Sequence, residues 1–176
     1  MRAGRGEWPR CRLRHGIVAL LLLALHLPMS AESALTLSAE VEGRGANARL
    51  RVSFSSRSAQ PILLLPSFET DAGTQHDNLL LDTGRSPQPL IAPRKSAAPR
   101  WCVLAAGASY SLQLPLTFWL EALRLPAPTG STARIGYLVG SDSPPAAALV
   151  CGTSAGPLVS APAWRGSLWS AAFALR

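Results

Sequence analysis

Residues 35–42 and 48–55 alternate apolar and polar side chains with a period of two. Residues 35, 37, 39 and 41 are apolar, as are residues 48, 50, 52 and 54, and polar residues stand between them. This is the pattern of β-strands that bury one face. The glycine-rich segment between them, residues 43–47 (GRGAN), predicts that the two strands form a hairpin or are neighbours in a sandwich.

Further short segments have the composition of strands, and proline limits what else they can form. The candidates are residues 61–65, 78–82, 101–104, 109–116, 134–140 and 147–151. Thirteen of the fifteen prolines follow residue 33, which argues against any long helix. Residues 117–125 (TFWLEALRL) fit either two helical turns or a continued strand. The sequence therefore predicts an all-β fold, a single antiparallel β-sandwich.

The expected sandwich is immunoglobulin-like in architecture but is not a true immunoglobulin domain. Such domains place a tryptophan about a dozen residues after the first cysteine and a tyrosine two residues before the second. Here Trp119 lies seventeen residues after Cys102, and Leu149 takes the place of the tyrosine before Cys151.

The first thirty-three residues have the layout of a cleavable secretory signal peptide. Five arginines precede an apolar stretch at residues 16–29, and Ala31 and Ser33 take the −3 and −1 places if cleavage follows Ser33. An uncleaved anchor is the alternative, but a transmembrane helix needs about 20 apolar residues. This stretch has fourteen residues, His26 and Pro28 among them. We expect an extracytoplasmic protein, periplasmic or secreted, in which residues 34–176 form one domain without a transmembrane span.

Removal of residues 1–33 leaves a weakly basic domain. The whole chain carries a net charge of +7, but residues 34–176 hold twelve Arg and Lys against eight Asp and Glu, which gives +4. A nucleic-acid-binding surface needs a clustered basic stripe with interleaved aromatic residues, and the sequence has none. A nucleic-acid partner is therefore not expected.

Two cysteines, Cys102 and Cys151, follow the expected cleavage site. An even number of cysteines in an exported chain favours one disulfide, and two buried free thiols are the alternative. Two cysteines and one histidine, His76, cannot supply the four ligands of a zinc site. The sequence thus predicts a Cys102–Cys151 bond, no metal site and no cofactor.

The segments ARLRVSFSSRSAQPILLL, NLLLDTG and LAAGASYSLQLPL loosely resemble bacterial extracytoplasmic sandwich modules. The likeness consists of the strand pattern and one glycine turn, and it includes no diagnostic residue. Some of these modules act as proteinase inhibitors. The resemblance implies a sandwich architecture.

One motif could carry catalysis. Residues 152–156 (GTSAG) fit the G-x-S-x-G nucleophile elbow, but no Asp, Glu or His follows Ser154, so the order of an α/β-hydrolase triad is not met. The longer segment CGTSAGPLV is similar to the GDSGGPLV signature of chymotrypsin-like serine proteases. Their order is met by His76, then Asp77 or Asp82, then Ser154. Thr153 replaces the acidic residue of that signature. A divergent serine hydrolase with His76, Asp82 and Ser154 is the catalytic alternative.

Acidic residues cluster beside His76. Glu69, Asp71, Asp77 and Asp82 lie within fourteen residues of one another. They could form an oxygen-rich Ca²⁺ loop, but their spacing matches no calcium signature. A solvated loop is therefore the favoured interpretation.

The next segment, residues 83–100, is basic and rich in proline. It carries Arg85, Arg94, Lys95 and Arg100 and no acidic residue. Loops on a rigid β-scaffold commonly bind partners, so we expect this segment to contact an acidic protein surface. Neutralisation by the preceding acidic loop is the alternative.

The C-terminal segment concentrates aromatic residues at Trp164, Trp169 and Phe173. As a strand it would place Trp169 and Phe173 on one face, and as a helix it would pair them at i and i+4. It could close the core, or it could expose an aromatic patch to a partner or a membrane interface.

These observations together predict an exported, non-catalytic binding or inhibitory module that contacts a protein partner. The expected contact residues are Arg85, Arg94, Lys95, Arg100, Trp164, Trp169 and Phe173. Two alternatives remain open at this point: the serine hydrolase centred on Ser154, and a structural subunit of an envelope assembly.

Overall fold

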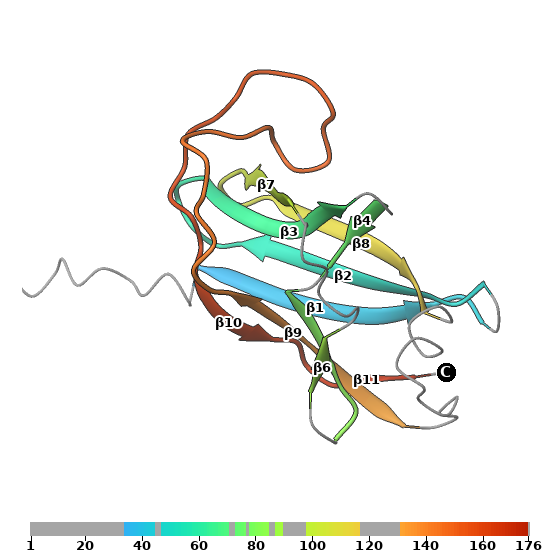
Figure 1. Ribbon diagram of the computed structural model, residues 1–176. Helices are drawn as coiled ribbons and strands as arrows, with labels where there is room; N and C mark the ends of the chain where they lie inside the picture. The colour runs from blue at the N-terminus through green and yellow to red at the C-terminus, as the bar shows by residue number, and fades with distance from the viewer. Residues whose placement is uncertain are drawn as a thin grey trace, which may run out of the picture.

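The computed structural model describes residues 34–44, 47–70, 73–76, 78–84, 87–89, 98–116 and 131–175 (Figure 1). In this part of the chain nearly all regular structure is β-strand, and every pair of named strands is antiparallel. The all-β prediction is confirmed. The signal peptide expected at residues 1–33 and the undecided segment 117–125 lie outside the described residues.

The strands form three sheets. The first has the order β1 (Leu35–Glu42), β2 (Arg49–Ser56), β8 (Ser109–Pro115). The second has the order β10 (Gly166–Trp169), β9 (Thr132–Val139), β5 (Leu79–Asp82), β6 (Gln88–Pro89), and β11 (Phe173–Ala174) also pairs with β9. The third has the order β4 (Gly73–Gln75), β3 (Ile62–Thr70), β7 (Ala98–Leu104). An immunoglobulin-like sandwich of two sheets stays a prediction.

The first two strands form the hairpin that the alternation predicts. Leu35 pairs with Ser56 and Glu42 with Arg49, so the apolar residues of both strands share a face. Leu50, Val52 and Phe54 on this face are fully buried. The polar side chains of this hairpin point away from the core, because successive side chains of a strand alternate between its faces. On this face the hydroxyls of Ser53 and Ser55 form hydrogen bonds with those of Ser111 and Ser109 in β8.

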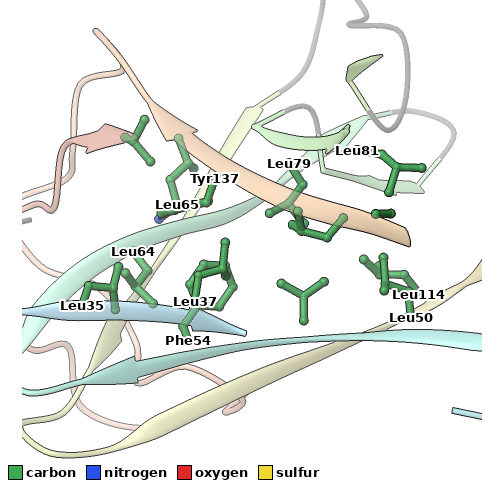
Figure 2. Close-up of a cluster of buried hydrophobic side chains, with 14 of the residues drawn as sticks. Leu35, Leu37, Leu50, Phe54, Leu64, Leu65, Leu79, Leu81, Leu114 and Tyr137 are labelled. Atoms are coloured by element: carbon green, nitrogen blue, oxygen red, sulfur yellow. The ribbon is translucent and has the colours of Figure 1, made fainter. Parts of the chain in front are cut away.

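All three sheets contribute to one hydrophobic core. Figure 2 shows side chains of β1 and β2 meeting those of β3, β5 and β9 in a single cluster. Near its centre the Tyr137 ring makes an edge contact with Phe54 at 4.8 Å and stacks on Trp164 at 5.1 Å between ring centroids. These contacts join β2, β9 and the segment before β10 through aromatic packing.

An irregularity in β3 leaves backbone groups without strand partners, and buried polar side chains hydrogen-bond to them. The pairing of β3 with β7 shifts register between Leu64 and Ser67, which takes backbone groups of Leu65 and Pro66 out of the ladder. The Leu65 N–H donates to the Tyr137 hydroxyl at 2.9 Å, and the Leu65 carbonyl accepts from Asn78 Nδ2. The Pro66 carbonyl lies 2.7 Å from His76 Nδ1. Burial raises the pKa of Tyr137, so the hydroxyl stays protonated.

Most strand predictions are confirmed. Five of the six further candidates coincide with β3, β5, β7, β8 and β9 to within a few residues, except that β3 and β7 extend beyond theirs. The sixth, residues 147–151, is wrong as a strand, since only isolated bridges form there, at Ala148 and Val150. Short strands β4 and β6 were not expected. The C-terminal segment, for which a strand and a helix were both considered, forms the two short strands β10 and β11. Within the described residues no helix is long and apolar enough to cross a bilayer.

Replacing Tyr137 by phenylalanine tests the role of its hydroxyl. Tyr137→Phe keeps the ring contacts but leaves the buried Leu65 N–H without an acceptor, which typically costs about 1–3 kcal/mol. We expect the free energy of unfolding, measured by urea denaturation, to fall by that amount. Tyr110→Phe, on the half-buried strand β8, is the control and should change it by less than about 0.5 kcal/mol. Equal effects of the two substitutions would contradict this assignment.

Candidate functional site

The three residues of the hydrolase alternative are held in separate environments. His76 is buried and contacts the Pro66 carbonyl. Asp82 accepts hydrogen bonds from Arg134 at 2.8 Å and from the Gly84 N–H at 2.9 Å, and these bonds lower its pKa. Ser154 is exposed between β9 and β10. Figure 1 places that segment at the top of the view and β6, which follows Asp82, near the bottom, so the structure does not bring the three together.

The acidic cluster gives no metal site in the described part of the chain. No three His, Cys, Asp or Glu residues there are close enough together to hold a metal ion. Glu69 pairs with Arg100, and Asp82 pairs with Arg134. Asp71 and Asp77 lie outside the described residues.

The basic segment is described only where it enters β7. Arg85, Arg94 and Lys95 lie outside the described residues, whereas Arg100 is exposed in the strand and pairs with Glu69. Among the described residues, the Arg100–Glu69 ion pair is thus a contact between the acidic and basic segments. Because the Arg100 side chain is 64% exposed, water screens the pair and its net contribution to stability is small.

The aromatic residues of the C-terminal segment have different roles. Trp164 is 2% exposed and stacks on Tyr137, so it belongs to the core and offers no surface to a partner. Phe173 is half-buried in β11 and packs against the same core. Trp169 in β10 is 37% exposed. The segment therefore closes the core and also leaves one aromatic ring at the surface.

The most distinctive surface element is the long connection between β9 and β10, residues 140–165, which we call the arm. It rises above β3 and β7 in Figure 1. Residues 143–164, between Asp142 and Arg165, include no charged side chain. Residues 150–158, which lie between the paired residues Ala148 and Val159 and which we call the arm tip, include Leu158 at 66% and Val150 at 37% exposure. The arm tip is thus an exposed, uncharged surface with two large apolar side chains.

Backbone hydrogen bonds fix the arm to the third sheet at both edges. The outgoing half pairs with β7: Val103 N–H donates to Leu149 O at 2.8 Å, and Cys151 N–H donates to Val103 O at 2.9 Å. The returning half pairs with β3: Leu63 N–H donates to Pro162 O at 2.8 Å, and Trp164 N–H donates to Leu63 O at 2.9 Å. The arm therefore covers strand edges that would otherwise expose unpaired backbone groups.

The two halves of the arm also bind each other. Ala148 and Val159 exchange two backbone hydrogen bonds, at 3.0 and 2.8 Å. At the base, the Arg165 guanidinium donates to the carbonyls of Gly140 and Asp142. A small apolar cluster of Leu63, Val103 and Ala148 is buried beneath, with Trp101, Val159, Ala161 and Ala163 packed against it.

The predicted disulfide is present and anchors the arm tip. Cys102 in β7 is bonded to Cys151, with a Cα–Cα distance of 4.8 Å. Thr153 adds a turn after the cysteine, because its N–H and its hydroxyl both donate to the Val150 carbonyl. The tip is therefore held covalently on one side and by the Ala148–Val159 pair on the other.

A groove of about 420 Å³ lies where the arm leaves the sheet. Its walls come from residues 99–101 of β7 and residues 143–149 of the arm, with Pro144 and Pro145 among them. Trp101 and Arg100 also line it. The Arg100 predicted as a contact residue thus lies beside the arm, at a concave surface with an aromatic and a cationic side chain.

Leu158 and Val150 were missed as candidate contact residues, although a signal was present. The 22 residues between Asp142 and Arg165 form a long stretch without a charged residue. The motif search singled out only Ser154 within it. The sequence did not decide whether Trp164 is buried or exposed, because the segment fitted both a strand and a helix.

No family model, curated protein or solved structure matches this chain. The function is therefore inferred from the geometry of the described residues.

Removal of the disulfide tests how the arm is held. A bond that closes a loop of this size stabilises a fold by up to about 4 kcal/mol in the chain-entropy model. We expect Cys102→Ala with Cys151→Ala to lower the free energy of unfolding by about 2–4 kcal/mol in urea denaturation. The unchanged protein under reducing conditions should show the same loss. A fall below about 0.5 kcal/mol in both samples would show that the bond does not restrain the chain.

Proposed function

We propose that this protein is an extracytoplasmic, non-catalytic binding module that presents the arm tip to a concave apolar site on a partner protein. The observation that carries the proposal is the combination of exposure and restraint at the tip. Leu158 is the most exposed large apolar side chain of the described chain. One end of the tip is bonded to β7 through the disulfide, and the other end is held by the Ala148–Val159 pair.

The composition of the arm supports a protein partner. The centres of protein interfaces are depleted in charged residues and enriched in apolar ones. An uncharged, exposed segment with Leu158 and Val150 at its end has that composition. A solvated loop without a partner usually carries charged side chains, and the arm has none between Asp142 and Arg165.

The anchoring of the arm also favours tight binding. A loop that is ordered before it meets its partner loses little conformational entropy on binding. Here the disulfide, the Ala148–Val159 pair and the bonds to Leu63 and Val103 order the arm in the isolated chain. Inhibition of a partner enzyme would follow if the tip enters that partner's substrate cleft.

An extracytoplasmic location is consistent with the disulfide and with the leader expected from the sequence. Disulfides persist in oxidising compartments and are rare in the cytosol. The Cys102–Cys151 bond is such a feature.

Site-specific photocrosslinking in the source organism tests the proposal. A photoreactive benzoylphenylalanine replaces Leu158 in one variant and Ser38, exposed on β1, in the control. We expect one discrete protein adduct from position 158 and none from position 38, because only the tip meets the partner. A third variant carries the same photoreactive residue at position 150 and should give the same adduct. Adding Leu158→Asp to this variant should remove the adduct, since a charge does not enter an apolar site.

Two outcomes would contradict the proposal. One is the absence of any adduct specific to positions 150 and 158 although the protein is exported and folded. The other is labelling by a fluorophosphonate probe that is lost in Ser154→Ala, which would establish the hydrolase alternative.

A further inference from the structure

The arm tip presents an unbroken run of exposed residues. Residues 152–158 are all exposed, and the residues on either side of them, Cys151 and Val159, are half-buried. Thr153 donates to the Val150 carbonyl, but the backbone N–H and carbonyl of Leu158 have no partner among the described residues. The backbone around the most exposed leucine can therefore pair with another molecule.

The backbone before Leu158 has little conformational freedom. Gly156 has a φ of +142°, which other residues rarely adopt, and a Cβ at this position would meet no atom within 4 Å. Pro157 then holds its own φ at about −65°, within the range of extended chains. The segment thus presents Leu158 in open space, and it loses little conformational entropy when it is bound.

The residue after Leu158 is held through both of its backbone groups. Val159 and Ala148 exchange two hydrogen bonds, at 2.8 and 3.0 Å. Five residues further on, Trp164 is buried in the core and donates its N–H to the Leu63 carbonyl. The peptide bond between Leu158 and Val159 therefore joins an exposed segment to a segment that is bound to the fold.

This arrangement has the features that an endopeptidase recognises. Clefts that bind extended peptides pair with the peptide backbone as with an added strand. In serine endopeptidases the residue before the cleaved bond enters a specificity pocket, which is a hydrophobic slot in chymotrypsin. Residues 156–158 (GPL) supply free backbone groups, a restricted chain and an exposed leucine. A simple apolar pocket would use the leucine alone, whereas a peptidase cleft uses all three features.

We propose that the partner of the arm tip is an endopeptidase that cleaves after apolar residues, and that Leu158 occupies its specificity pocket as a substrate-like inhibitor. This inference rests on the proposed function of the arm tip and names the class of its partner. The pocket of trypsin instead contains an aspartate and binds basic side chains. Residues 143–164 include no basic side chain, so a trypsin-like partner does not fit.

The fold favours inhibition over release of a cleaved product. Hydrolysis of the Leu158–Val159 bond consumes one water and leaves a carboxylate on Leu158 and an amine on Val159. The Leu158 end stays tied to β7 through the Cys102–Cys151 bond. The Val159 end stays tied through its pair with Ala148 and through β10 and β11, which pair with β9. Neither new end leaves the cleft readily, so the enzyme stays occupied.

Inhibition of purified peptidases by the full exported chain tests the proposal. The probes are chymotrypsin and subtilisin, which accept apolar residues before the cleaved bond, and trypsin is the control enzyme. The remaining activity of each enzyme is read with a small chromogenic peptide. We expect at least one of the two probes to be inhibited with a Ki of about 1 μM or lower, and trypsin to keep its full activity.

One substitution at the surface should exchange the specificity. Leu158→Arg should weaken inhibition of the sensitive probe by about a hundredfold or more, because an apolar slot rejects a charge. It should also create inhibition of trypsin, whose pocket binds arginine. Leu138→Arg is the matched control, since Leu138 is 49% exposed in β9, outside the arm. The same change there should leave the inhibition of all three enzymes unaltered.

Removal of the disulfide tests why the tip inhibits. In the variant with Cys102→Ala and Cys151→Ala, the Leu158 end is no longer tied to β7. Mass spectrometry should then detect faster cleavage between Leu158 and Val159 than in the unchanged protein, and inhibition should decline as cleavage proceeds.

Three results would overturn this inference. The first is full activity of both chymotrypsin and subtilisin with the chain at about 10 μM, and the second is inhibition that Leu158→Arg leaves unaltered. The third is an arm-tip photoadduct with a protein that is not a peptidase, in which case the proposed binding function stands. Absence of any adduct would contradict the proposed function itself, so the two failures are distinguishable.

Discussion

The hydrogen bond from the Leu65 N–H to the Tyr137 hydroxyl is the contact on which the rest of the structure depends. It lets β3 break register with β7 without leaving a buried donor unpaired, and Asn78 and His76 satisfy the neighbouring carbonyls. The same Tyr137 ring packs between Phe54 and Trp164. One residue of β9 therefore joins the first sheet, the irregular strand of the third sheet and the end of the arm. Because Trp164 also donates its N–H to Leu63, the position of the arm follows from this core.

The arm covers two strand edges and also forms an exposed surface. The edges of β3 and β7 at Leu63 and Val103 would expose backbone groups, and the two halves of the arm pair with them. The arm tip is held by the Cys102–Cys151 bond to β7 and by the Ala148–Val159 pair. The contacts that stabilise the arm thus also hold the tip, so the tip is already ordered in the isolated chain. The Trp169 ring is held by a different contact, because its indole lies directly on Gly136 in the central strand β9.

Local patterns predicted much of the fold. Period-two alternation identified the β1–β2 hairpin, because each of these two strands buries one side. The disulfide followed from the number of cysteines. What could not be predicted depends on contacts distant in sequence: residues 147–151 have the composition of a strand but form only isolated bridges. His76 resembled a catalytic residue because its role, a hydrogen bond to the carbonyl of Pro66, exists only after β3 has folded. Trp164 and Trp169 are five residues apart, and only the packing separates a core residue from an exposed one.

Amide hydrogen exchange along the arm tests most directly whether the disulfide and the backbone hydrogen bonds hold the arm tip in place. The account predicts that the amides of Leu63, Val103, Cys151, Val159 and Trp164 are protected to a degree similar to that of the core strands, since each is hydrogen-bonded to or within the arm. The exposed amides of Gly152, Ser154 and Gly156 should exchange rapidly between these protected positions. Rapid exchange at Cys151, Val159 and Trp164, while the amides of β1 and β2 stay protected, would show an arm that moves freely and would contradict the central claim.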